Sequence, residues 1–323
     1  MATKLSLYPW QESVWSRLQA YQTQNRLPQA LLLSGPKGIG KRRLVHYFAR
    51  FILCENGNIC GECGSCKLLA GDSHPDLQVI APEPGKPITV DAMRVLIDGL
   101  SLRSQYGKGR IVIVDSADRM NIASANSFLK TLEEPGPDTH IVLICETSGL
   151  LPATIRSRCQ QIKLIPPAED IALAWLQDQG HELEAAKLAL TLNHQAPLLA
   201  KSWLESDSPA KRQKFLRHWH ALMESRLDPV LLAEQWKEES VEELLSWITV
   251  LTGDLVRMAF GLSDRIMNLD CQTLLQKYGK QLNLRKLMNY WQQLLETSQD
   301  CHSQANRQLM LEALFIATYR LTS

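Results

Sequence analysis

Residues 30–42 have the sequence ALLLSGPKGIGKR, and this stretch decides the fold. Its first part, Ala30–Ser34, is an unbroken apolar run, which is typical of a strand covered on both faces. The glycine-rich part that follows matches the phosphate-binding loop G-x-x-x-x-G-K-[ST] at every fixed position except the last, where Arg42 stands. A strand, a glycine loop and a following helix predict an α/β domain built around a phosphate-binding loop.

Further apolar runs in the first half of the chain have the same character and predict additional buried strands. They are Leu77–Ala81, Arg110–Asp115, His140–Cys145 and Gln161–Ile165. Between the runs lie stretches with apolar residues at helical spacing. These are Arg42–Leu53, Val90–Leu102 and Ala123–Leu132. Because strands that alternate with helices form βαβ units, the sequence predicts a parallel sheet with helices packed on it.

The second half of the chain has a different composition. Of 17 glycines and 15 prolines, 13 and 12 fall within residues 1–169, so turns concentrate there. Beyond Pro166 the apolar residues recur every three or four positions, which is typical of long helices. We interpret two such stripes as core, with partner-binding faces as the alternative. The stripes are Val241, Leu244, Leu245, Ile248, Leu251, Leu255 and Met258, and then Leu287, Trp291, Leu294 and Leu295.

The expected fold class is therefore α/β plus all-α, in a chain long enough for two or three domains. We expect a P-loop domain with a parallel sheet over residues 1–167, including an inserted cysteine module at about 54–66. A small helical domain should follow over residues 168–207. A larger helical domain should complete the chain over residues 208–323.

Composition and charge exclude several classes of protein. Lys and Arg number 35 against 34 for Asp and Glu, so a net charge of +1 argues against a chain that coats nucleic acid by bulk electrostatics. No apolar run reaches the roughly 18 residues of a membrane span. The N-terminal segment lacks the apolar core of a signal peptide. We expect a soluble cytoplasmic protein with no membrane partner, whose eight cysteines meet a reducing environment.

The glycine-rich loop suits phosphate binding through Gly35, Gly38, Gly40 and Lys41. Glycines let backbone N–H groups close around a phosphate at a helix N-terminus, and Lys41 would reach the outer phosphates. The position that normally offers a hydroxyl to Mg²⁺ carries Arg42, and a cation does not coordinate a cation. We interpret the loop as a degenerate site for ATP or ADP. The alternative is a glycine-rich turn that binds nothing.

A second element of such sites is an apolar strand that ends in an acid. Asp115 ends the run Ile111–Asp115 and stands where an ATPase of this type holds its magnesium, although alone it also fits an ordinary strand-end acid. The next residue is usually a glutamate that polarises the attacking water, and here it is Ser116. With Arg42 and Ser116 both outside the pattern, the sequence predicts a chain with no complete catalytic centre and no ATPase activity of its own.

Four cysteines form a third motif, within CENGNICGECGSC. Cys54, Cys60, Cys63 and Cys66 can surround Zn²⁺ tetrahedrally, and the glycines between them allow the tight turns that this requires. With no open coordination position the ion would be structural. His74 is an alternative ligand that we prefer as a loop residue. Four free thiols in a surface loop are a weaker alternative in a cytosolic chain. A redox dithiol is weaker still, because it needs only one Cys-x-x-Cys.

The last motif is Ser157-Arg158-Cys159, and a lone arginine before a strand is more often a salt-bridge partner than a catalytic residue. With the preceding features, however, the chain resembles one family, the clamp loader of bacterial DNA polymerase III in the AAA+ superfamily. The matching segments follow one another in the family's order over nearly the whole first domain. They are Gly35–Lys41, the four-cysteine module, Ser73–Asp76, Val114–Met120, Asn126–Pro135 and Ser157–Cys159. The helical second half matches only in character and length.

Two kinds of subunit in that family share this architecture. Motor subunits, called gamma or tau, keep an intact phosphate loop and an Asp-Glu pair. The other kind keeps the zinc module and the Ser-Arg-Cys motif but has a degraded ATP site, and Arg42 and Ser116 place this chain with it. The resemblance implies a stator subunit. Arg158 would enter the ATP site of the adjacent motor subunit as a trans arginine, with Ser157 and Cys159 orienting it.

The resemblance also implies partners. Residues 168–207 would form the helical lid of the AAA+ domain, and residues 208–323 would form a helical collar for oligomerisation. Through the collar the subunit would join the gamma or tau subunits and the delta subunit in a five-subunit ring, which opens the sliding clamp and places it on primed DNA. It would thereby belong to a DNA-directed DNA polymerase holoenzyme, a nucleotidyltransferase.

Two other functions compete with this one. An autonomous P-loop ATPase is disfavoured by Arg42 and Ser116. A zinc-containing DNA-binding module is disfavoured by the near-neutral charge and by the absence of a basic run near the cysteines.

Overall fold

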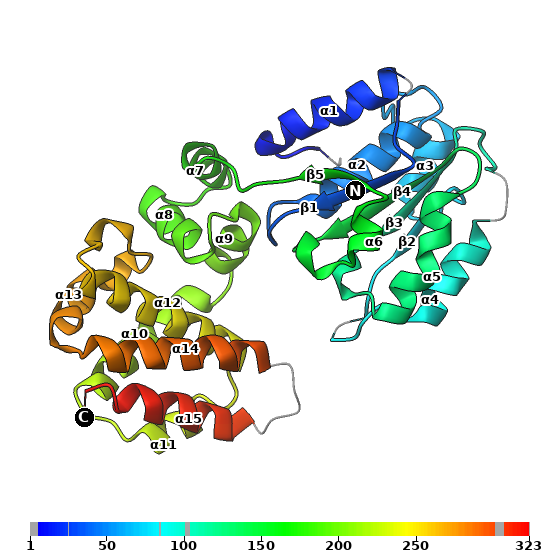
Figure 1. The fold of residues 1–323 in the computed structure, drawn as a ribbon. Helices are drawn as coiled ribbons and strands as arrows, with labels where there is room; N and C mark the ends of the chain where they lie inside the picture. The colour runs from blue at the N-terminus through cyan, green and yellow to red at the C-terminus, as the bar shows by residue number, and fades with distance from the viewer. Residues whose placement is uncertain (1–5, 25, 84, 101–103, 301–306, 323) are drawn as a thin grey trace. The chain divides into compact units, whose positions relative to one another are not determined.

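The computed structural model describes residues 6–24, 26–83, 85–100, 104–300 and 307–322 (Figure 1). Residues 101 and 102, predicted to end a helix, lie outside the described residues. The chain forms two compact units. The first is Met1–Trp175 with Ala196–Leu198, and the second is Leu176–Gln195 with Leu199–Ser323. The finer division of the chain at residues 167 and 207 stays a prediction.

In the first unit, strands alternate with helices along the chain. The strands are β1 (Ala30–Ser34), β2 (Leu77–Ile80), β3 (Arg110–Val114), β4 (Thr139–Cys145) and β5 (Gln160–Lys163). The α-helices are α1 (Glu12–Thr23), α2 (Lys41–Leu53), α3 (Gly64–Ala70), α4 (Val90–Gly99), α5 (Ile122–Glu133) and α6 (Ala153–Arg156). Single 3-10 turns are η1 (Pro9–Gln11), η2 (Ala117–Arg119) and η3 (Ser148–Leu150).

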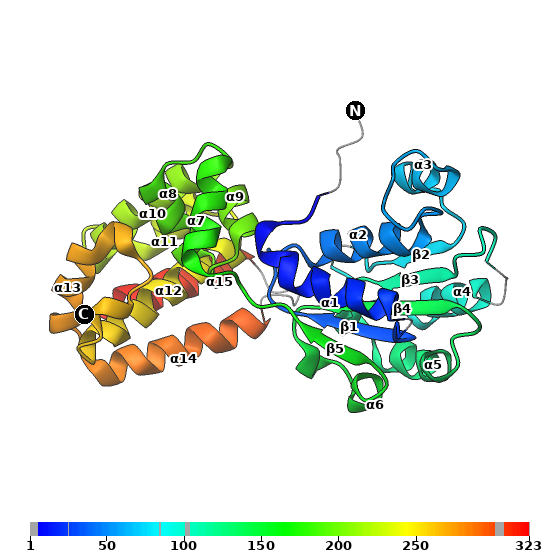
Figure 2. The same ribbon diagram turned by 90° about the horizontal axis from the view of Figure 1, so that it is seen from above.

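The five strands form one parallel sheet in the order β2-β3-β4-β1-β5. Helices cover both faces (Figure 2). Successive side chains of a strand point to opposite faces, so Leu33 packs with Phe48 of α2 whereas Leu32 belongs to the same core as Phe128 of α5. Burial on both faces explains the unbroken apolar runs of the central strands, and the predicted α/β fold is confirmed.

The two edge strands differ from the prediction of fully covered strands. In β2, Val79 is 47% exposed. In β5 only Ile162 is buried, and the strand ends at Lys163. Ile165, which the sequence places in this strand, lies beyond it and is 69% exposed. An edge strand has a neighbour on one side only, so its apolar residues need not all be covered.

From α7 onward every element is helical. The helices are α7 (Glu169–Asp178), α8 (Leu183–Leu192), α9 (Pro197–Leu204), α10 (Ser208–Met223), α11 (Pro229–Gln235), α12 (Val241–Ala259), η4 (Ser263–Arg265), η5 (Leu269–Cys271), α13 (Gln272–Gln281), α14 (Leu284–Asp300) and α15 (Arg307–Tyr319). Within the second unit, α12 packs against α13, α14 and α15. Its core includes Phe215, Trp219 and Trp236, so the predicted all-α second half is confirmed.

The stripe predicted as core on α12 is buried from Val241 to Leu255, with Met258 partly buried at its end. The stripe on α14 is buried at Leu287 and Leu294. Leu295 is 44% exposed, and its assignment to the core was wrong. Consecutive residues on a helix lie about 100° apart, so the residue after Leu294 turns away from the face that packs.

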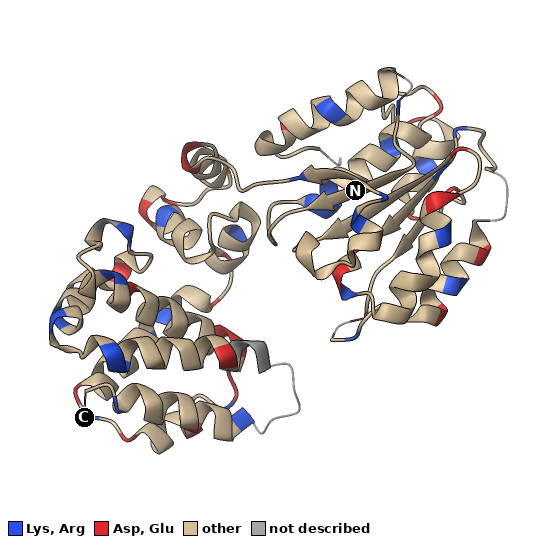
Figure 3. Ribbon diagram, in the orientation of Figure 1, with Lys and Arg blue, Asp and Glu red and all other residues tan. Residues whose placement is uncertain are grey.

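The surface carries both signs of charge. Figure 3 shows Lys and Arg interspersed with Asp and Glu along the helices of each unit. No helix among the described residues is long and apolar enough to cross a membrane.

Candidate functional site

The glycine-rich loop connects β1 to α2 and depends on glycine for two different reasons. Gly40 caps α2 with a φ of +84°, in the left-handed region. A Cβ on Gly40 would lie 2.7 Å from the Gln11 side chain and from the Tyr8 ring. A Cβ on Gly35 would lie 2.3 Å from the carbonyl oxygen of Leu164. The loop is therefore packed too closely to accept a side chain at either position.

Two side chains from the N-terminal segment hold the end of this loop. Gln11, which is fully buried, donates through Nε2 to the carbonyl oxygens of Ile39 (3.2 Å) and Gly40 (2.8 Å). Trp10 donates through Nε1 to the Ile39 carbonyl at 3.0 Å. Neither residue was predicted as part of the site, because nothing in the local pattern of residues 8–11 indicates contact with a loop so far along the chain.

Lys41 folds back on its own loop. Its Nζ donates to the carbonyl oxygens of Gly35 (2.6 Å) and Pro36 (2.8 Å), and the side chain is buried. Burial lowers the pKa of Lys41. The negative charges of Glu146 and other nearby acids raise it by a smaller amount, so the pKa stays below its ordinary value. The ammonium group is thus held by carbonyl oxygens of its own loop.

Arg42 forms an ion pair with Asp115, which directly follows β3. The Arg42 side chain is 65% exposed, whereas that of Asp115 is only 9% exposed. Ser116 follows with its hydroxyl 3.4 Å from the same carboxylate. The acid predicted to hold magnesium is therefore paired with a guanidinium of the same chain, and the next position carries Ser116 in place of a second carboxylate.

These residues line one cavity of about 570 Å³. Of the predicted nucleotide-site residues it brings together Gly38, Gly40, Lys41 and Asp115, while Gly35 lies outside its lining. Its described lining includes more basic than acidic side chains. The basic residues are Lys37, Lys41, Arg42, Arg43 and Arg119, and the acidic ones are Asp115 and Glu146. Arg43 and Arg119 were missed, because a lone arginine carries no signal of its orientation.

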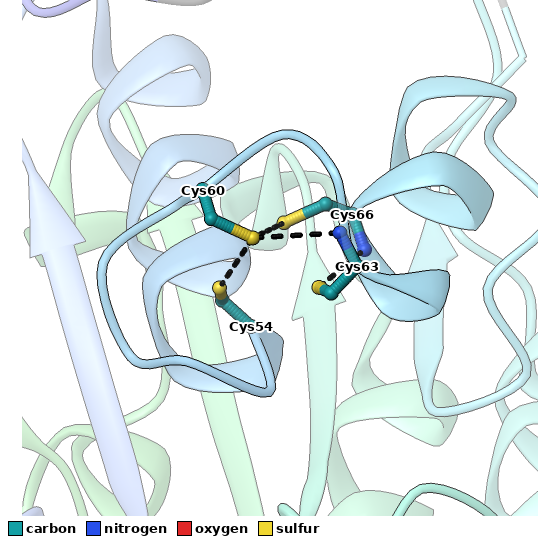
Figure 4. Close-up of side chains that lie close together, drawn as sticks. All are labelled: Cys54, Cys60, Cys63 and Cys66. Carbon is teal, nitrogen blue, oxygen red and sulfur yellow. Dashed lines mark hydrogen bonds between the residues drawn. The ribbon is translucent and has the colours of Figure 1, made fainter.

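The four cysteines of the predicted metal site lie together where α2 ends and α3 begins. Figure 4 shows their sulfur atoms turned toward one another, and all four Sγ atoms lie within 4.8 Å of each other. The Cys54–Cys60 and Cys60–Cys66 sulfur distances are 3.8 and 4.0 Å. Sulfurs placed about 2.3 Å from a tetrahedral zinc lie about 3.8 Å apart, so the cluster fits a metal of that size.

Hydrogen bonds and burial change the pKa values of these thiols in opposite directions. Burial tends to raise the pKa of Cys54, but hydrogen bonds from the backbone at Cys60, Asn58 and Asn56 outweigh it and lower the pKa to about 6. Burial raises the pKa of Cys66 to about 12. The cluster therefore contains one thiol that ionises readily and another that needs a cation to ionise.

His74 belongs to the support of the cysteine module and not to its ligands. Its Nε2 lies 2.8 Å from the Ser65 hydroxyl, which donates to the Leu53 carbonyl at 2.6 Å. Leu53 and Ser65 directly precede Cys54 and Cys66, so this buried chain of hydrogen bonds ties the module to the sheet domain. Its position agrees with the preference for His74 as a loop residue.

Arg158 follows α6 and has a half-exposed side chain. It donates through Nε to Glu133 Oε1 at 2.7 Å, and Nη2 contacts the same oxygen. The Ser157 hydroxyl donates to the Thr154 carbonyl at 3.1 Å. Cys159 is buried, and burial raises its pKa to about 11, so its thiol stays protonated and acts as a packing group.

The parallel sheet separates Arg158 from the phosphate loop. Gln160 of β5 is opposite Leu31 of β1. Arg158 precedes Gln160 at the amino edge of the sheet, whereas Gly35 follows β1 at the carboxyl edge. The structure therefore brings the P-loop residues together but does not bring Arg158 to them.

Comparisons with known proteins agree with this arrangement. Residues 10–168 match the family described as "DNA polymerase III, delta subunit", and residues 206–318 match its C-terminal counterpart, "DNA polymerase III, delta subunit, C terminal". The "DNA polymerase III subunit delta'" of Pseudomonas aeruginosa is 33% identical over 96% of both chains. The chain belongs to the delta' family of DNA polymerase III. Relatives with the same name from Haemophilus influenzae and Escherichia coli are 32% and 30% identical, over 78% and 87% of this chain and 78% and 85% of their own.

Membership of the delta' family confirms the predicted resemblance. The parallel sheet with its glycine-rich loop and its four-cysteine cluster confirms the predicted α/β fold with a cysteine module. The match extends over the helical half as well, where the sequence motifs were silent.

Proposed function

We propose that this chain is the stator subunit of a clamp loader and that Arg158 acts in the ATP site of an adjacent motor subunit. The observation that carries the proposal is the position of Arg158 at the sheet edge opposite its own phosphate loop. At about 3.3 Å per residue, the backbone from Leu31 to Gly35 alone covers about 13 Å. An arginine so placed does not reach the phosphate loop of its own chain, so any phosphate that it contacts would belong to a neighbouring subunit.

Arginine suits that role because its planar fork of N–H donors matches phosphate oxygens and keeps its charge at all relevant pH values. Charge that builds up on a transferred phosphoryl group is stabilised by such a donor, and trans arginines contribute roughly 10³–10⁵ in rate in GTPases. Ser157 and Cys159 would act as positioning residues. Ser157 is bonded to the Thr154 carbonyl and Cys159 is anchored in the core.

The chain's own phosphate loop supports the stator assignment. We propose that Gly35, Gly38, Gly40, Lys41 and Asp115 form a degenerate nucleotide site. Its basic cavity would hold the phosphates of ATP or ADP. The ion pair with Arg42 takes the Asp115 carboxylate that would otherwise hold magnesium, and Ser116 supplies no carboxylate to polarise water. A site that lacks these catalytic groups agrees with a stator that has no motor activity of its own.

For the cysteine module we propose structural zinc, held by Cys54, Cys60, Cys63 and Cys66. The donor set is all thiolate, and a closed site of four sulfurs leaves no position for substrate. The ion would join the end of α2 to the start of α3 and stabilise the turns between them.

The partners that follow from this role are the gamma or tau motor subunits and the delta subunit, in a five-subunit ring. Through that ring the chain would contribute to opening the sliding clamp and placing it on primed DNA, in the cytoplasm. The interspersed charges of each unit (Figure 3) do not favour a zinc-containing DNA-binding module.

The test is turnover of a reconstituted loader that contains Arg158→Ala or Arg158→Lys. Both variants should assemble normally, because a partly exposed ion pair contributes about 0–1 kcal/mol to stability. ATP turnover stimulated by clamp and primed DNA should fall with alanine, and lysine should not restore it, because a point charge does not reproduce the fork. The loss should be smaller than in GTPases, since other sites of the ring keep their own arginines.

Arg17→Ala is the matched control, because Arg17 is an exposed arginine on α1 whose hydrogen bond among the described residues is local, to the Tyr21 hydroxyl. Unaltered turnover in Arg158→Ala at saturating clamp and DNA would refute the trans role. Loss of assembly would instead assign Arg158 to a subunit interface.

A further inference from the structure

The guanidinium of Arg158 is already occupied within this chain. Glu133, the last residue of α5, accepts from Nε at 2.7 Å and also from Nη2 through the same carboxylate oxygen. Nη1 donates to the Thr154 carbonyl at 2.9 Å and lies 3.5 Å from the Ser157 hydroxyl. One carboxylate and one carbonyl therefore hold the fork against the surface of its own domain.

This arrangement conflicts with phosphate binding. Bidentate recognition of a phosphate uses two parallel N–H donors on one edge of the guanidinium. The edge formed by Nε and Nη2 is taken by Glu133, and the edge that includes Nη1 is partly taken by Thr154. A carboxylate beside the fork would also repel the negative charge of an incoming triphosphate.

We propose that Glu133 is a latch that holds Arg158 in a disengaged position until an ATP-bound neighbour competes for it. The inference rests on the proposed trans role and adds its regulation. Arg158 then exchanges one anion for another, from the carboxylate of Glu133 to the phosphate of the neighbouring site. Glu133 touches neither substrate nor nucleotide in this scheme and acts only through Arg158.

The latch has to be weak enough to open. The side chains of Arg158 and Glu133 are 34% and 51% exposed, so water screens their attraction. Ion pairs of this kind shift an equilibrium by up to about fivefold. Because the apparent affinity of a site is reduced by the fraction of molecules that are competent to bind, release of the latch should improve engagement by a similar factor.

Glu133→Gln tests the latch, because it removes the charge and preserves the size of the side chain. In the reconstituted loader, with clamp and primed DNA below saturation, we expect ATP turnover to rise by up to about fivefold. Glu134→Gln is the matched control, because Glu134 is the neighbouring exposed glutamate and makes no ion pair among the described residues. It should leave turnover unchanged.

A second measurement observes the latch directly. In the free chain, the Nε–H proton of Arg158 should exchange with water more slowly in the wild type than in Glu133→Gln. Equal exchange rates would overturn the latch, and so would turnover that stays constant or falls in Glu133→Gln.

The variant Arg158→Ala distinguishes failure of the latch from failure of the trans role of Arg158 on which the latch rests. If Arg158→Ala lowers turnover and Glu133→Gln does not raise it, the trans role stands and the latch fails. If Arg158→Ala has no effect, the trans role fails, and the latch as a regulator fails with it. The double variant should behave as Arg158→Ala, because a latch has no effect without the arginine it holds.

Discussion

Replacing Arg42 by threonine restores the residue type of a working phosphate loop and tests whether the guanidinium has taken the place of the metal. The change leaves the Asp115 carboxylate, only 9% exposed, without its cationic partner. Breaking a fully buried ion pair costs about 3–5 kcal/mol, whereas an exposed pair contributes about 0–1 kcal/mol. Because Arg42 is 65% exposed and Asp115 is not, we expect a loss of about 1–2 kcal/mol.

For a unit of this size, 1 kcal/mol corresponds to about 2–4 °C in Tm, so Arg42→Thr should lower the melting temperature of the first unit by about 2–8 °C. The assay is thermal unfolding of the single variants and of Arg42→Thr combined with Asp115→Asn. In the double variant most of the loss should disappear, because no unpaired charge remains. Lys37→Thr is the matched control, since Lys37 is an exposed cation of the same cavity and makes no ion pair among the described residues.

Two results would refute this reasoning. One is a melting temperature of Arg42→Thr equal to that of the wild type. The other is an equal loss whether residue 115 is aspartate or asparagine. Either would mean that Arg42 does not neutralise Asp115, and the degenerate site would need another explanation.

Three further predictions concern turnover, metal and pH. The purified chain should hydrolyse ATP at background rate, and a steady turnover that disappears in Lys41→Ala would instead indicate an autonomous ATPase. Elemental analysis should find one zinc per chain, lost in Cys63→Ser but kept in Cys145→Ser, whose residue is buried away from the module; a zinc-free wild type would contradict the assignment. Burial tends to raise the pKa of Asp76, but hydrogen bonds from Tyr106, Gln105 and Ser104 outweigh it and lower the pKa below 3.8. The ionised Asp76 carboxylate therefore stabilises the fold fully above pH 3.8, and this stabilisation is lost as the pH falls through the lowered pKa of the folded state. Asp76→Asn should lower the free energy of unfolding in urea by about 1–3 kcal/mol at neutral pH. The difference in unfolding free energy between variant and wild type should become smaller below pH 3.8 and stay constant above it.

Much of the first unit can be predicted from short stretches of sequence. The central strands β1, β3 and β4 coincide with apolar runs to within a residue, because burial on both faces leaves a continuous local signal. The phosphate loop and the four cysteines are equally local, since their chemistry depends on residues a few positions apart. The same motifs in the same order are enough to identify the family.

The contacts that give the site its character come from the tertiary structure. In the sheet, β3 is separated from β1 by β4 alone, so Asp115 after β3 lies near the start of α2, which follows β1, and pairs there with Arg42. Gln11, which precedes α1 in the sequence, donates a hydrogen bond to the same loop. The parallel register of β5 on β1 puts Arg158 at the edge away from its own loop, next to Glu133. Periodicity and motifs report which residues a segment must bury or which ligand it suits. They do not report the order of the strands within the sheet. That spatial order decides which charged side chains, distant in sequence, form ion pairs.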